Sequence, residues 1–198
     1  VADPRSVVPT LCANIYSAPA SRLTTMAVTG TNGKTTTSYL MRAAIASRFP
    51  QASLCGTVEM HVGPISFEAV RTTAEAPVIA RFLAATEQYE CGAGVIELSA
   101  HALSLHRVDG VVFDVAAFTN LQHAHLDYYG DMEHYFAAKA LLFTPEHSRA
   151  GVVCVDDKWG QRLAAEATVP VTTVSALSTT SADWQVRDIA PDQSIGRT

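Results

Sequence analysis

The sequence predicts an α/β protein with a three-layer, mostly parallel sheet built around a phosphate-binding turn. Short apolar runs alternate with segments of helical periodicity, the pattern of a parallel sheet covered on both faces. A Gly-rich turn, from Gly30 to Lys34, joins the first apolar run to the first long helical segment. Several apolar runs also end in polar residues, and ligands bind at the carboxyl ends of strands in such sheets.

Each element is predicted from its own pattern of apolar residues and breakers. Pro19 separates a short lead-in helix from the first strand, and the helix after the Gly-rich turn ends before Pro50. The other predicted helices cover residues 6–16, 76–89, 131–143 and 157–167. The predicted strands cover residues 23–28, 51–59, 65–70, 94–99, 113–118, 151–155, 169–174 and 184–189.

Composition narrows the class of protein. The 198 residues are 48% hydrophobic, which is enough to fill a sizeable core. Only 17% are charged and the net charge is −5, so no basic stripe exists to bind a nucleic acid or a membrane surface. The four cysteines form no C-x-x-C pair, and no apolar run approaches the ~20 residues of a membrane span. We therefore expect a soluble, cytoplasmic protein with reduced cysteines.

The Gly-rich turn has the chemistry of a phosphate cradle. Its glycines allow the backbone to approach an anion, and the free amides at the start of the next helix point toward that anion. Lys34 would reach the β- and γ-phosphates, and the Thr35 hydroxyl could bind Mg²⁺. The motif is a variant, because Val28 stands where the strict pattern has its first Gly. The candidate phosphate-binding residues are Gly30, Thr31, Asn32, Gly33, Lys34, Thr35 and Thr36.

Two later strand ends carry groups that suit phosphate or a hard metal ion. Glu97 follows Val95 and Ile96, where an unpaired charge would be costly to bury. A Mg²⁺ ion held by Thr35, Glu97 and nucleotide phosphates would offset that cost. A Glu that simply reaches solvent is the alternative. The second group is the polar run 120–127, after the predicted strand 113–118.

Several ordered motifs resemble the Mur ligase family. They are Thr29-Gly30-Thr31-Asn32-Gly33-Lys34-Thr35-Thr36, Thr72-Thr73-x-Glu75, Glu97-Leu98-Ser99-x-His101, Arg107-Val108, Phe118-Thr119-Asn120-Leu121, His125-Leu126-Asp127, Gly130-Asp131-Met132-Glu133-His134-Tyr135 and Ala138-Lys139. The resemblance covers residues 3–157 and weakens beyond them. It is closest to the branch of the family that adds the third residue of the peptidoglycan stem peptide.

The resemblance implies a three-domain ligase of which this chain is the central part. Residues 1–20 would be a linker with a lead-in helix from a missing N-terminal domain. Residues 21–198 would be the central ATP-binding domain, truncated at its C-terminal end. The family fold has a P-loop-type ATP-binding core, in agreement with the fold class predicted above.

The family reaction implies ATP and Mg²⁺, a UDP-MurNAc-dipeptide substrate and an amino acid, acting in peptidoglycan synthesis. The dipeptide carboxylate becomes an acyl phosphate, which the amine of the third amino acid then attacks. By motif match, Lys34 stabilises the transferring phosphate, Thr35 and Glu97 hold the first Mg²⁺, and His125 holds the second. Lys139 matches the lysine that the family carbamylates beside that second metal. The matches to substrate-contacting positions are Thr72, Thr73, Ser99 and Arg107.

Four positions depart from the family pattern. Ala74 replaces a Pro, Ala100 a Ser, Ala124 an Asp and Cys154 an Asn. The changes at 124 and 154 remove a carboxylate that could orient His125 and an amide that could bind the base. We expect weakened nucleotide binding from them.

Three functional hypotheses remain open from the sequence. The first is a ligase fragment that is monomeric and inactive by itself. The second is a degenerate relative that binds ATP in a regulatory or scaffold role. The third is a relative with another substrate, such as a folylpolyglutamate or cyanophycin synthetase, and the matches at Thr72, Thr73, Glu75 and Arg107 speak against it.

Overall fold

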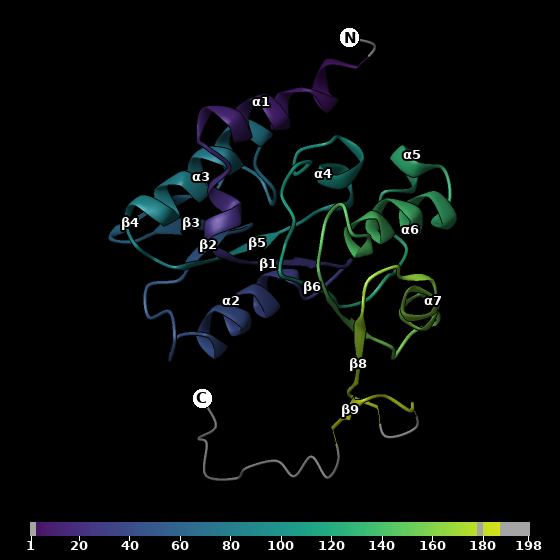
Figure 1. The fold of residues 1–198 in the computed structure, drawn as a ribbon. Coiled ribbons are helices and arrows are strands. Elements are labelled where there is room, and N and C mark those ends of the chain that lie inside the picture. The colour runs from purple at the N-terminus through teal and green to yellow at the C-terminus, as the bar shows by residue number, and fades with distance from the viewer. Residues whose placement is uncertain (1–2, 178–179, 187–198) are drawn as a thin grey trace.

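The computed structural model describes residues 3–177 and 180–186, and within them nine strands form a single sheet (Figure 1). The strand order is β4-β3-β2-β5-β1-β6-β7-β8-β9. Strand β3 pairs antiparallel with both β2 and β4, and every other pairing between these strands is parallel. The strands are β1 (Thr24–Thr29), β2 (Ser53–Cys55), β3 (Glu59–Val62), β4 (Ile65–Glu68), β5 (Ala93–Glu97), β6 (Val115–Phe118), β7 (Gly151–Cys154), β8 (Val171–Ser175) and β9 (Trp184–Gln185).

Helices connect these strands. The α-helices are α1 (Val8–Ile15), α2 (Lys34–Ala44), α3 (Ala76–Gln88), α4 (Ala100–Ser104), α5 (Leu126–Tyr129), α6 (Met132–Ala140) and α7 (Lys158–Glu166). Short 3₁₀ turns are η1 (Pro4–Ser6), η2 (Pro19–Arg22) and η3 (Leu141–Phe143). No helix in the described ranges is long and apolar enough to cross a membrane.

Two apolar clusters, one on each face of the sheet, hold the three layers together. On one face, Tyr39 and Met41 of α2 pack against Met26, Leu54 and Val95. The larger cluster lies on the other face, where α3, α4, α6 and α7 cover the sheet. Figure 1 shows α2 beneath the sheet, with α3 and α4 above it. The predicted three-layer α/β fold is therefore confirmed.

The position of β1 explains where a ligand would bind. The chain leaves β1 through α2 toward β2 on one side of the sheet, whereas β6 is the neighbour of β1 on the other side. Such a reversal of strand order opens a crevice at the carboxyl ends of the strands. The Gly-rich turn follows β1 and therefore lies at that crevice.

Element boundaries differ from the sequence prediction in a few places. Helices α4 and α5 were not predicted, because each is a single turn or little more and shows no apolar periodicity. The predicted helix 131–143 is divided into α6 and η3. The predicted strand 51–59 was wrong in its bounds, because the chain turns at residues 56–58 between β2 and the antiparallel β3, which was not predicted. Strand β6 begins at Val115, because Phe113 pairs with Ser148 in an isolated bridge. In the predicted strand 184–189, residues 184–185 form β9 and residues 187–189 lie outside the described residues.

The lead-in segment packs on the domain. Helix α1 lies against α3, and Arg22 of η2 forms an ion pair with Glu87 near the end of α3. The Arg22 guanidinium also donates to the Ser17 carbonyl at 2.6 Å. These contacts fix the direction in which the chain enters β1.

Candidate active site

The Gly-rich turn adopts a conformation that its two glycines make possible. Gly30 has φ +149°, and a Cβ there would lie 1.9 Å from Thr119 Oγ1. Gly33 has φ +83° and precedes the first residue of α2, with open space around the position of its missing Cβ. No side chain caps the N-terminus of α2. The first amides of an 11-residue helix are therefore free to bind an anion.

The polar run after β6 holds this turn in place. Asn120 Oδ1 accepts a hydrogen bond from the Asn32 amide at 3.0 Å, and Gln122 Oε1 accepts one from Asn32 Nδ2 at 2.9 Å. The Thr119 hydroxyl donates to the Asn32 carbonyl at 2.7 Å. The run 120–127 was predicted to follow a strand end, but no role was predicted for Thr119 or Gln122. Their pairing with the turn depends on β1 and β6 being neighbours, which no local pattern reveals.

Two lysines converge on the carbonyl of Gly30. Lys34 Nζ donates to it at 3.1 Å and to the Thr31 carbonyl at 3.0 Å, and Lys139 Nζ donates to it at 2.9 Å. Burial lowers the pKa of Lys34, and the charge of Glu97 partly offsets this effect. Burial, followed by the charge of Lys34, lowers the pKa of Lys139 to about 7. The side chain of Lys139 is almost completely buried, so two lysine amines meet at the turn with backbone carbonyls as their hydrogen-bond partners.

Glu97 is a fully buried carboxylate surrounded by hydroxyl groups. Its Oε2 accepts from Thr35 Oγ1 at 3.0 Å and from Thr57 Oγ1 at 2.9 Å. Its Oε1 accepts from Ser38 Oγ at 3.1 Å and from the Thr57 amide at 3.3 Å. Within the described part of the chain no ion pair includes Glu97. A Cβ on Gly56 would lie 2.1 Å from its Oε1, so the backbone there packs directly on the carboxylate.

This donor set is suited to Mg²⁺. The ion prefers hard oxygen ligands and usually takes one or two carboxylates, with phosphates and water completing its shell. Glu97 supplies a carboxylate with no cationic partner in contact, and Thr35 supplies an adjacent hydroxyl. Among residues 3–177 and 180–186 no group of three or more His, Cys, Asp or Glu side chains could hold a metal ion. A Mg²⁺ ion would therefore need ligands from a bound nucleotide.

His125 lies at the outer edge of the same region. The centre of its ring lies 6.0 Å from the centre of the Tyr135 ring, and Lys139 Nζ lies 4.7 Å from the centre of that Tyr135 ring. The ring of His101 packs edge-on against His125 at 5.2 Å. Lys34, Thr35, Glu97 and Lys139 thus lie together at the turn, and His125 is linked to them through Tyr135.

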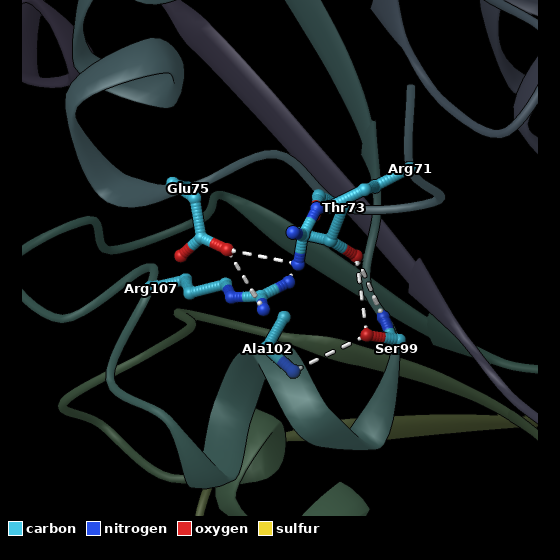
Figure 2. A network of polar contacts seen from close by, with 6 residues as sticks. All are labelled: Arg71, Thr73, Glu75, Ser99, Ala102 and Arg107. Atoms are coloured by element: carbon cyan, nitrogen blue, oxygen red, sulfur yellow. Dashed lines mark hydrogen bonds and ion pairs between the residues drawn. The ribbon is translucent and has the colours of Figure 1, made fainter. Parts of the chain in front are cut away.

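Three of the four candidate substrate residues, Thr73, Ser99 and Arg107, belong to a second polar network, which Figure 2 shows. The Thr73 hydroxyl donates to the Glu97 carbonyl at 2.8 Å and accepts from the Ser99 amide at 2.9 Å. Arg107 donates to the Thr73 carbonyl at 3.0 Å and pairs with Glu75 at 2.9 Å. The buried Thr73 therefore positions its neighbours, and Thr72, Ser99 and Arg107 are more accessible.

A cleft beside the turn could hold the rest of a nucleotide. It encloses about 640 Å³ and is lined by Leu121 to His123, by Asp131 to Glu133 and by Asp157 to Trp159. Gln122 belongs both to this cleft and to the segment that holds the turn. Cys154, expected near a base, is not among the lining residues, and its thiol donates to Asp156 at 3.5 Å. Asp157 in the cleft caps α7 through the Gly160 amide and also accepts from the Leu121 amide.

The fold and the turn define a P-loop-type α/β domain. The family model described as the Mur ligase middle domain matches residues 28–197. The chain belongs to the Mur ligase family, as its motifs predicted.

Named relatives agree with this assignment. The chain is 46% identical over 189 residues to UDP-N-acetylmuramoyl-L-alanyl-D-glutamate–2,6-diaminopimelate ligase of Streptomyces coelicolor, covering 96% of this chain and 37% of that protein. It is 43% identical over 197 residues to UDP-N-acetylmuramyl-tripeptide synthetase of Leifsonia xyli, covering 100% of this chain and 38% of that protein. The chain thus spans less than two-fifths of the length of these relatives.

Solved structures show the same fold. A UDP-N-acetylmuramoyl-L-alanyl-D-glutamate–2,6-diaminopimelate ligase superposes with a TM-score of 0.78 at 27% identity, covering 92% of this chain and 39% of that one. Folylpolyglutamate synthase of Mycobacterium tuberculosis, complexed with ADP and AMPPCP, has a TM-score of 0.65 at 14% identity, covering 86% and 48%. At that identity the second likeness shows the fold alone.

Proposed function

We propose that this chain is the central, ATP-binding part of an ATP-dependent ligase of peptidoglycan precursor synthesis. The ligase would join an amino acid to the dipeptide carboxylate of UDP-MurNAc-dipeptide. The observation that carries the proposal is the convergence of Lys34, Lys139, Thr35 and Glu97 on one turn at the carboxyl end of β1. The names of the relatives support the choice of reaction.

The reaction has two steps. An oxygen of the dipeptide carboxylate attacks the γ-phosphorus of ATP, the bond to the β–γ bridging oxygen breaks, and ADP leaves. The amine of the amino acid then attacks the acyl carbon of the acyl phosphate, losing a proton, and inorganic phosphate leaves. Both steps need reactants held in line and charge neutralised along the phosphates.

The residues of this chain would meet those needs. Free amides at the start of α2 and the backbone of the turn bind the phosphates. Lys34 exchanges its contacts with two backbone carbonyls for the β- and γ-phosphates. The cleft at Leu121 to His123 and Asp157 to Trp159 takes the nucleoside. Thr72, Ser99 and Arg107 face the second substrate, and Arg107 offers a planar fork suited to a carboxylate or phosphate.

Thr35 and Glu97 would hold Mg²⁺, with His125 as a ligand of a second ion. The bound ions neutralise charge on the phosphates during transfer. Because its pKa is lowered to about 7, Lys139 has a large neutral fraction near pH 7. A neutral amine is the form that reacts with CO₂, which supports the carbamylation that the family resemblance implies. A cytoplasmic location and a monomeric state stay predictions, and the four free cysteines are consistent with a reducing compartment.

Isothermal titration of the chain with ATP and Mg²⁺ tests the proposal. We expect saturable heat that disappears without Mg²⁺. Lys34→Ala should weaken binding by about 10- to 100-fold, since it removes charge-assisted hydrogen bonds to phosphate. Arg81→Ala, which removes one positive charge from an exposed position on α3, is the matched control. No heat with the unsubstituted chain, or equal affinity in Lys34→Ala, would contradict the proposal.

A further inference from the structure

The short turn 56–58, between β2 and β3, lies between the two halves of the candidate site. On one side, Thr57 reaches Glu97 with both its hydroxyl, at 2.9 Å, and its amide, at 3.3 Å. On the other side, the hydroxyls of Thr57 and Thr72 lie 3.2 Å apart. Thr57 thus contacts both the carboxylate that faces the phosphate turn and the loop proposed to face the second substrate.

The Thr57 hydroxyl is the shared donor of these two contacts. It donates to Glu97 Oε2 at 2.9 Å and is also placed to donate to Thr72 Oγ1 at 3.2 Å. A carboxylate can only accept hydrogen bonds, so the single Thr57 proton is divided between these two acceptors. Thr35 donates to the same oxygen of Glu97 at 3.0 Å. One path of hydrogen bonds therefore runs from the first turn of α2 through Glu97 and Thr57 to Thr72.

Packing around the turn leaves these groups little freedom. The lack of a side chain at Gly56 brings the backbone against Glu97, because a Cβ there would lie 2.1 Å from Oε1. The Val58 carbonyl accepts a hydrogen bond from the Ala69 amide at 3.2 Å, which attaches the loop 69–73 to the turn. At its far end this loop returns to Glu97, where the Thr73 hydroxyl donates to the Glu97 carbonyl at 2.8 Å.

We propose that Thr57 is a positioning residue that couples occupation of the nucleotide site to the order of the loop 69–73. When a nucleotide with its metal ion engages Glu97, the carboxylate holds Thr57, and Thr57 holds Thr72 in place for the second substrate. The inference rests on the proposed function. It adds a residue that contacts neither the phosphates nor the reacting carboxylate but determines whether both halves of the site are ordered together.

Hydrogen–deuterium exchange of the whole chain, with and without the ATP analogue AMPPCP and Mg²⁺, tests this coupling. The ligand should slow exchange in residues 30–36 and also in residues 69–73. Thr57→Val keeps the shape and the amide but removes the hydroxyl. It should keep the protection of residues 30–36 and lose that of residues 69–73, a change of about two- to tenfold in exchange rate.

Three further variants complete the design. Thr57→Ser restores the hydroxyl and should restore loop protection. Thr72→Val removes the other end of the same contact and should behave like Thr57→Val, which guards against a local folding defect at position 57. Thr172→Val changes an exposed threonine of β8 in the same way and should match the unsubstituted chain.

The outcomes are distinct. Loop protection that survives in both Thr57→Val and Thr72→Val would overturn the inference, and so would a loop that never responds to the ligand while residues 30–36 do. If residues 30–36 are themselves unprotected in the unsubstituted chain, the proposed nucleotide binding fails, and this inference fails with it.

Discussion

The two glycines of the Gly-rich turn should differ sharply in their tolerance of a methyl group. Both have positive φ, +149° at Gly30 and +83° at Gly33, so alanine at either position strains the backbone. At Gly33 the methyl group meets open space. At Gly30 it would lie 1.9 Å from Thr119 Oγ1, which must move and give up its 2.7 Å hydrogen bond to the Asn32 carbonyl.

These differences determine how much each variant should lower the free energy of unfolding. Gly33→Ala should lower it by the strain of a left-handed residue alone, about 1–2 kcal/mol. Gly30→Ala should cost about 1–3 kcal/mol of backbone strain and a further 0.5–1.5 kcal/mol or so for the lost hydrogen bond. We therefore expect Gly30→Ala to be the more destabilising change by about 1–2 kcal/mol.

Urea unfolding followed by far-ultraviolet circular dichroism measures both changes. The free energies of unfolding are compared between variants whose free energy has the same slope against urea concentration, so that a difference reflects stability alone. Thr119→Val serves as a reference, since it removes the same hydrogen bond without straining the turn. If Gly30→Ala unfolded at the same urea concentration as Gly33→Ala, the close packing of Thr119 on the turn would be refuted.

Three further predictions concern charge, pH and packing. Glu97→Gln should reduce Mg²⁺-dependent nucleotide affinity at least about tenfold. It should not lower the melting temperature measured in Mg²⁺-free buffer, because it removes a buried charge that has no cationic partner in contact. A lower melting temperature would contradict this account. Burial lowers the pKa of Lys139 in the folded chain to about 7 from 10.5, so the unfolded chain binds more protons between these values and stability should rise with pH across them. Lys139→Met should abolish this rise, which is at most about 4 kcal/mol, in urea titrations from pH 6 to 10; an unchanged slope would show that Lys139 is not its source. Phe143→Ala should lower the free energy of unfolding by about 3–5 kcal/mol. Gly151→Ala should be less destabilising in the Phe143→Ala background than in the unsubstituted chain, because the new methyl group would lie 2.8 Å from Phe143 Cδ1. Strict additivity in the double variant would argue against this contact.

The local sequence determined most of the architecture. Apolar runs and breakers placed most of the strands and the longer helices, although β3 was not predicted as a strand of its own. The Gly-rich turn indicated a candidate phosphate site. Both signals are encoded by neighbouring residues. The ordered motifs identified the family. Helices α4 and α5 were not predicted, since each is too short to show an apolar periodicity.

Individual roles in the site depended on the fold. Sequence chemistry predicted that Glu97 would need partners, but those partners come from α2 and from the turn 56–58, far away along the chain. Thr73 matched a substrate position, yet its hydroxyl is used within the protein. Thr57 gave no local signal at all, because a Gly-Thr pair in a sequence indicates no particular function. Its contact with the Glu97 carboxylate exists only in the folded chain.

By itself, then, the sequence determined the fold class, the family and the candidate residues for phosphate and magnesium, since these follow from periodicity, ordered motifs and side-chain chemistry. Only the tertiary structure decided which of those side chains form hydrogen bonds with one another and which remain free to bind a ligand. Strands β1, β5 and β6 lie side by side although they are far apart along the chain, and their pairing brings Lys34, Glu97 and Asn120 to one edge. Such non-local contacts are fixed by packing of the whole sheet, which no window of sequence contains.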